Sequence, residues 1–92
     1  MQQEAAETVA LQALEWLVSD EDLLAVFLGA SGQSSDDLEL RTQDIDFLGS
    51  VLDFVLMDDA WIVRFCDSRE LAYDAPLQAR AALPGGGEVH WT

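Results

Sequence analysis

Residues 44–58 constrain the fold most, because this stretch is apolar over more than half of a helical circumference. With about 100° between successive residues of an α-helix, its hydrophobic side chains cover an arc of roughly 200°. These are Ile45, Phe47, Leu48, Val51, Leu52, Phe54, Val55 and Leu56, and the remaining strip holds Asp46, Ser50, Asp53 and Met57. One neighbouring helix cannot cover so wide a face. The stretch therefore predicts a central helix surrounded by several others.

Other segments also carry the helical pattern, and none alternates polar and apolar residues as a strand does. Helices are expected over residues 3–18, 20–28, 59–67 and 75–83, with a short one that Ser34 or Ser35 caps and that runs to Leu40. The fold class predicted is all-α, a compact bundle of five or six helices. Ser19, Asp58 and Asp74 are the expected N-caps of three helices, and Gly29 or Gly32 supplies a left-handed residue at the end of the second.

The two halves of the chain align after a shift of 38 residues, which brings residues 14–18 onto 52–56 and Phe27 onto Phe65. Each half then contains a long helix, an acid-capped turn, a second helix and a short capped helix. The alignment predicts two helical hairpins related by a pseudo-twofold and packed through their long helices. The alternative is that any two amphipathic helix pairs with aspartate caps align this well.

The charge balance restricts the partners of the chain. Eighteen acidic residues stand against four arginines and no lysine, for a formal net charge of -14 at pH 7. Nucleic-acid binding is not expected, because it needs cations that displace the counterions of phosphate, and an acidic membrane surface would repel the chain. The acids either serve solubility alone or complement a basic protein partner.

Length and cysteine content predict one small domain in a reducing compartment. We expect a single helical domain over residues 1–87 and a flexible C-terminal tail over residues 88–92. Cys66 is the single cysteine and cannot form an internal disulfide, and the longest apolar run, residues 23–30, is far short of the ~20 residues of a membrane span. A cytoplasmic protein is predicted. Because half of the residues are hydrophobic, a homodimer is an alternative to a monomer.

A series of landmark residues extends over residues 9–86. It comprises Leu24, Phe27, Leu28, Gly32, Leu40, Arg41, Phe47, Leu48, Val51, Leu52, Asp53, Phe54, Asp58, Asp59, Phe65, Pro76, Ala82 and Leu83. In this order the chain resembles a family of small uncharacterised helical proteins of alphaproteobacteria, a domain of unknown function. Similar proteins are expected to have a proline just before Phe47, where this chain has Ile45 and Asp46. The resemblance implies a small helical fold and brings no activity, cofactor or site.

No pattern in the sequence is typical of a catalytic, metal or cofactor site. The single histidine, His90, lies in the expected tail, and Cys66 lies on the apolar side of its helix with no histidine or lysine nearby to stabilise a thiolate. Ser34 and Ser35 are the only candidates for the phosphopantetheine of an acyl carrier protein. They lack the Asp-Ser-Leu order of such carriers, and N-capping explains both. We expect no catalytic residue, no metal and no cofactor.

The expected partner-binding residues are Trp61, Met57 and Arg64. Trp61 begins a helix at the edge of its apolar arc, where a large ring can stay partly exposed and anchor an interface, and burial in the core is the alternative. Arg41 and Arg80 each end a short helix, a position that favours pairing with carboxylates. The pattern favours a non-enzymatic, acidic protein–protein interaction or regulatory module. A structural homodimer, or a small carrier or enzyme with a site not visible in the sequence, is the alternative.

Overall fold

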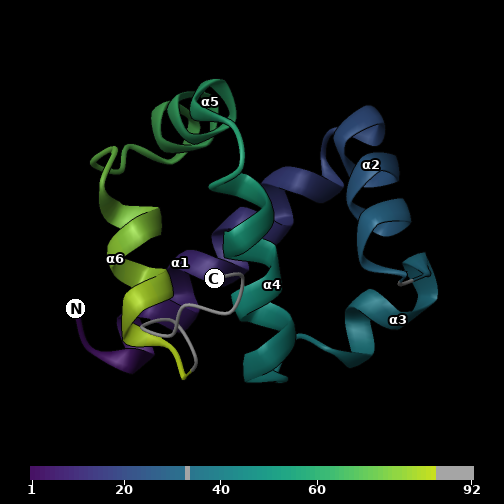
Figure 1. Cartoon of the computed structure of the whole chain (residues 1–92), viewed down its shortest axis with the longest axis horizontal. Coiled ribbons are helices and arrows are strands. Elements are labelled where there is room, and N and C mark those ends of the chain that lie inside the picture. The colour runs from purple at the N-terminus through teal and green to yellow at the C-terminus, as the bar shows by residue number, and fades with distance from the viewer. Residues whose placement is uncertain (33, 85–92) are drawn as a thin grey trace, which may run out of the picture.

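The computed structural model describes residues 1–32 and 34–84, and this part contains six α-helices and no strand. The helices are α1 (Gln3–Val18), α2 (Glu21–Ser31), α3 (Ser35–Leu40), α4 (Ile45–Val55), α5 (Asp59–Arg69) and α6 (Ala75–Ala82). They form a compact body with a radius of gyration of 12.2 Å (Figure 1). The prediction of an all-α fold of five or six helices is confirmed. The tail predicted for residues 88–92 lies outside the described residues, and so do His90 and Trp91.

Helix α4 lies at the centre of the fold, as its wide apolar face requires (Figure 1). Helices α1 and α6 both pack against it, and Phe27 of α2 contacts it from another side. Its buried residues are Phe47, Leu48, Gly49, Val51, Leu52, Phe54 and Val55. The prediction of a central, surrounded helix is confirmed, and α4 ends at Val55. Residues 56 and 57 form a turn, which frees Asp58 to cap the next helix.

Aromatic rings connect the helices across the core. Trp16 of α1 lies against Phe65 of α5 with 5.8 Å between the ring centroids. Phe27 of α2 meets Phe47 and Phe54 of α4 edge-on, at 6.0 and 5.3 Å. These are favourable geometries for aromatic pairs, because the positive edge of one ring faces the negative face of the other. Trp16 is buried.

The turn between α1 and α2 differs from the prediction, because Asp20 and not Ser19 is the N-cap of α2. One carboxylate oxygen of Asp20 accepts hydrogen bonds from the backbone N–H groups of Asp22 and Leu23, at 3.1 and 3.2 Å. The Ser19 hydroxyl instead donates to the carbonyl oxygen of Trp16 at 2.7 Å. A carboxylate caps as well as a hydroxyl and adds a favourable interaction of its charge with the helix dipole.

Helix α2 continues past its predicted end at residue 28 and ends at Ser31. The next residue, Gly32, has the left-handed φ of 73° that was predicted for one of two glycines. Only part of the apolar surface of α2 faces the core. Leu23 and Phe27 are buried, whereas Val26 is 52 % exposed. Since nearly every residue after the first turn of α2 is apolar, its position at the edge of the molecule and not its periodicity decides which side chains are covered (Figure 1).

The predicted N-cap positions of α3, α5 and α6 are occupied by Ser34, Asp58 and Asp74. The backbone N–H and the hydroxyl of Ser34 both donate to the carboxylate of Asp37, at 3.3 and 3.0 Å, at the start of α3. Asp58 accepts from the backbone N–H of residue 60 at 2.8 Å and caps α5. Asp74 precedes α6 but makes no capping bond with its side chain, which accepts from the Gln78 amide at 2.7 Å.

The order of the helices repeats after 38 residues, but their packing does not. Helix α2 covers Glu21–Ser31 and α5 covers Asp59–Arg69, the same bounds displaced by 38 residues. The long helices α1 and α4 pack against each other, as predicted. Helix α6 packs on both of them, whereas its counterpart α3 lies at the periphery next to α2 (Figure 1). Because α6 packs on both long helices and α3 does not, the two halves contribute differently to the core.

Candidate functional site

A pocket of about 200 Å³ opens between α2 and α4, and we call it the α2–α4 groove. Its floor contains the rings of Phe27 and Phe54, which are almost completely buried and lie edge to face. The groove is lined by Phe27, Ala30, Ser31, Ser50, Asp53, Phe54 and Met57. The strip of α4 that lacks apolar core residues thus forms one wall, and the C-terminal end of α2 forms the other.

The rim of the groove combines an apolar side chain with a carboxylate. Met57 is 75 % exposed, and the side chain of Asp53 is 53 % exposed. Methionine is unbranched and polarizable, so it adapts its shape to a partner surface. The groove is therefore suited to an apolar side chain that has a cation close to it.

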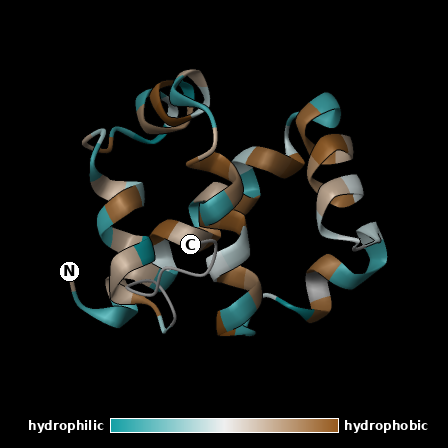
Figure 2. Ribbon diagram, viewed as in Figure 1, coloured by the Kyte–Doolittle hydropathy of each residue, from teal (hydrophilic) through white to brown (hydrophobic). Residues whose placement is uncertain are grey.

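The outer face of α2 extends this apolar surface. Ala30 is exposed and lines the groove, and Val26 lies one helical turn before it on the same face. Figure 2 shows that α2 is hydrophobic over most of its length after the acidic first turn. Exposed apolar side chains therefore lie on both sides of the groove, Val26 and Ala30 on α2 and Met57 just after α4.

A second pocket, of about 330 Å³, lies between the C-terminal end of α1 and α3, and we call it the α1–α3 pocket. It is lined by Leu14, Glu15, Val18, Ser19, Leu38 and Thr42. Glu15 at its edge forms an ion pair with Arg69 of α5, with 3.8 Å between the charged atoms. The sequence shows no sign of this pocket, because its two walls come from segments that are far apart in the chain.

Trp61 lies behind the floor of the α2–α4 groove. Its half-buried ring stacks on Phe54, with centroids 4.7 Å apart and 24° between the planes. Of the predicted partner-binding residues, Trp61 thus stacks on a ring of the groove floor, and Met57 lines the groove. Trp61 supports the ring that a ligand in the groove would touch.

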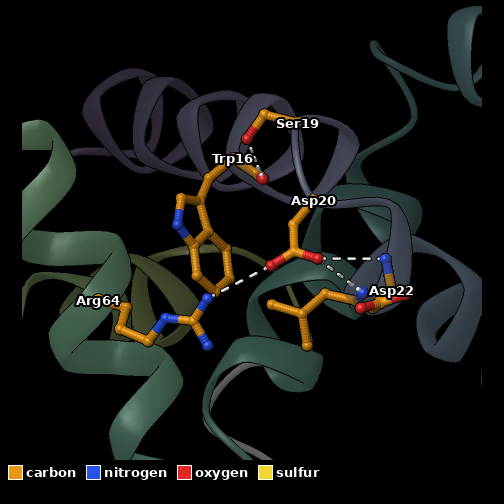
Figure 3. Close-up of polar contacts among 6 residues, drawn as sticks. Trp16, Ser19, Asp20, Asp22 and Arg64 are labelled. Atoms are coloured by element: carbon orange, nitrogen blue, oxygen red, sulfur yellow. Dashed lines mark hydrogen bonds and ion pairs between the residues drawn. The ribbon is translucent and has the colours of Figure 1, made fainter.

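The third predicted partner-binding residue, Arg64, lies at the junction of α1 and α2 (Figure 3). Its Nη2 atom is 3.3 Å from Oδ2 of Asp20, and its guanidinium carbon is 6.0 Å from the centre of the Trp16 ring. The same Asp20 carboxylate caps α2 with its other oxygen. Arg64 is 59 % exposed, so the ion pair contributes little to stability. The Arg64 guanidinium therefore makes an intramolecular contact between α5 and the α1–α2 turn, and Arg64 does not line the groove.

The remaining arginine pairs include one that bears directly on the groove. Arg80 of α6 is 16 % exposed, and its Nε donates to Oδ1 of Asp53 at 2.7 Å. Its guanidinium lies over Gly49, where a Cβ atom would come within 2.9 Å of Nη1. Arg41 similarly pairs with Asp44 at 2.8 Å. The predicted pairing of Arg41 and Arg80 with carboxylates is confirmed.

Cys66 is completely buried, and its thiol donates to the carbonyl oxygen of Ala72 at 3.4 Å. Burial raises the pKa of this thiol, and the carboxylates of Asp67 and Asp74 raise it further. In residues 1–32 and 34–84, no three His, Cys, Asp or Glu side chains are grouped so that they could hold a metal ion. Over the same residues, none of the helices has both the length and the hydrophobicity that crossing a membrane requires.

The fold and the surface define a class of small, acidic, all-helical proteins with an exposed apolar groove. The chain belongs to the family described as "Protein of unknown function (DUF3572)", whose family model matches residues 3–86. The resemblance to a domain of unknown function is thereby confirmed. Comparison with the curated proteins and with the solved structures found no match.

Proposed function

We propose that this chain is a non-enzymatic interaction module that binds a basic protein partner in the cytoplasm through the α2–α4 groove. The observation that carries the proposal is an apolar groove with exposed Met57 at its rim on a chain of net charge -14. The apolar surface supplies contact area, and the negative field attracts and orients a basic partner.

The same charge disfavours the alternative of a structural homodimer. Two copies that each carry -14 repel each other, whereas a basic partner is attracted from a distance. The cytoplasmic assignment is supported by Cys66, a buried free thiol, since a reducing compartment preserves it. Cell fractionation that finds the native protein in an oxidising compartment would contradict it.

Affinity capture from native cells tests the proposal. The chain serves as bait at about 0.1 M and at about 1 M salt, between which the Debye length falls from about 10 to about 3 Å. We expect a stoichiometric basic protein that is retained at low salt and released at high salt. Recovery of the bait alone at both concentrations would overturn the proposal.

Two bait variants separate the groove from other exposed apolar residues. Met57→Ser removes the apolar rim, and Leu40→Ser removes an exposed apolar side chain at the end of α3 that does not line the groove. Neither side chain is buried, so both variants are expected to fold. The proposal requires that Met57→Ser lowers recovery of the partner and that Leu40→Ser leaves it unchanged.

A further inference from the structure

We infer that the occupant of the α2–α4 groove is a cationic amphipathic helix that inserts one apolar side chain over Phe27 and Phe54 and places a lysine or arginine beside Asp53. The inference rests on the proposed function and specifies its partner. It follows from the size of the groove, its helical walls and its charge.

The size of the groove matches a side chain better than a free small molecule. Its volume is about 200 Å³, whereas pockets for small molecules typically measure about 300–1,000 Å³. Two aromatic rings and the flexible Met57 surround the space, so an aliphatic or aromatic side chain makes contact on several sides.

The walls of the groove favour a helix over an extended peptide. An extended peptide gains its affinity by adding a strand to a sheet edge, and residues 1–32 and 34–84 contain no strand. The walls are two helices that carry the small residues Ala30, Ser31 and Ser50 along the groove, which lets a third helix approach closely. A helix that docks in this way presents apolar residues at the spacing i, i+3, i+4 and i+7.

The charge of the groove determines which residues flank the apolar stripe of the docking helix. Asp53 accepts from Arg80 with one oxygen, yet its side chain stays 53 % exposed at the rim. Asp46 is exposed on the same strip of α4, two turns before it. With a net charge of -14 behind these carboxylates, a helix with Lys or Arg beside its apolar stripe is attracted and one with Glu or Asp is repelled.

A synthetic helix of leucine and lysine is the probe that tests the inference. The peptide has about 15 residues, the length at which an isolated helix becomes stable, with its leucines on one face. The readout is the NMR signal of ¹³C-labelled methionine methyl groups. The chain has two methionines, Met57 at the groove and Met1 far along the sequence as an internal reference. We expect saturable movement of the Met57 signal and no movement of the Met1 signal.

Matched variants separate docking in the groove from diffuse charge attraction. Ala30 and Ala81 are both exposed and are each the penultimate residue of a helix, and only Ala30 lines the groove. Both Ala30→Lys and Ala81→Lys add one positive charge. Ala30→Lys is expected to weaken peptide binding at least about tenfold by filling the groove, and Ala81→Lys by less than about twofold.

Each contrary result overturns the inference in a recognisable way. Equal weakening by Ala30→Lys and Ala81→Lys would mean that the peptide binds by diffuse charge alone. Equal binding of a scrambled peptide, or of a leucine–glutamate peptide, would remove the amphipathic or the cationic requirement. Movement of the Met57 signal with protein concentration alone would identify a second copy as the occupant. If cells yield no partner the proposed function fails, whereas loss of the Ala30/Ala81 difference overturns only the assignment of the occupant.

Discussion

Replacement of Gly49 with alanine tests the close packing of α4 against α6. In the interior of a helix, alanine is more favourable than glycine by about 1 kcal/mol. In this fold the new Cβ atom would lie 2.9 Å from Nη1 and 3.1 Å from Cζ of Arg80. Carbon contacts are optimal only at about 3.5–4.0 Å. The guanidinium must therefore move away from α4, and the bond from Nε to Asp53 is strained or broken.

The expected effect is a difference between two opposing terms. A hydrogen bond to a charged group contributes about 1.5–3 kcal/mol, and the half-exposed Asp53 reduces this to about 1 kcal/mol. Gly49→Ala in the native background is therefore expected to change the free energy of unfolding by less than about 0.5 kcal/mol. In an Arg80→Met background, which keeps the apolar stem and lacks the guanidinium, the same change is expected to stabilise by about 1 kcal/mol.

Urea denaturation of the four proteins of this cycle measures the coupling, expected to be about 1 kcal/mol. Gly29→Ala is the matched control, because Gly29 lies in α2 and a Cβ atom there meets nothing within 4 Å. This control is expected to stabilise equally with and without Arg80. The close contact between Gly49 and Arg80 is contradicted if Gly49→Ala stabilises as much as Gly29→Ala and its coupling to Arg80 is below about 0.3 kcal/mol.

Three further predictions concern single residues. Cys66 is expected to resist iodoacetamide at about pH 8 in the native chain and to react after unfolding, since burial and a raised thiol pKa leave little accessible thiolate; rapid labelling of native protein would contradict this. The pKa of Asp44 is lowered from 3.8, first by the backbone N–H of Phe47 and then by Arg41. The Asp44 carboxylate therefore contributes its full stabilisation above the unfolded pKa of 3.8. The difference in thermal stability between the native chain and Asp44→Asn is expected to vanish as the pH falls through the lower pKa of the folded state. A difference that does not change with pH would argue against this. Phe65→Ala empties a completely buried site and is expected to cost about 3–5 kcal/mol in urea denaturation, and a loss below about 1 kcal/mol would show that the site is not tightly packed.

The central helix could be predicted because local sequence and burial agree there. The arc of α4 from Ile45 to Val55 is too wide for any arrangement except a surrounded helix. The buried face of the edge helix α2 could not be predicted in this way. Its residues are apolar on all sides after the first turn, so the exposure of Val26 depends on where the rest of the chain places the helix.

The candidate site could be predicted only in part, for the same reason. The strip of Ser50, Asp53 and Met57 is visible in the sequence as the side of residues 44–58 that lacks apolar core residues. Its opposite wall on α2 is not visible, because only the tertiary fold brings the two helices together. Arg64 was predicted as a contact residue, but its partner Asp20 lies 44 residues earlier in the chain. No local pattern indicates that pairing.

The incomplete repeat explains why both pockets exist. In the second half, α6 packs on α1 and α4 and covers part of the wide apolar face of the central helix. If α3 occupied the equivalent position, it would close over the same two long helices from the other side. Instead α3 stands away from α1 and leaves the α1–α3 pocket, while α2 meets α4 through the ring of Phe27 and leaves the α2–α4 groove. A chain in which half of the residues are hydrophobic thus keeps part of its apolar surface uncovered on the side of its N-terminal half, and the proposed basic helix would cover the part of it in the α2–α4 groove.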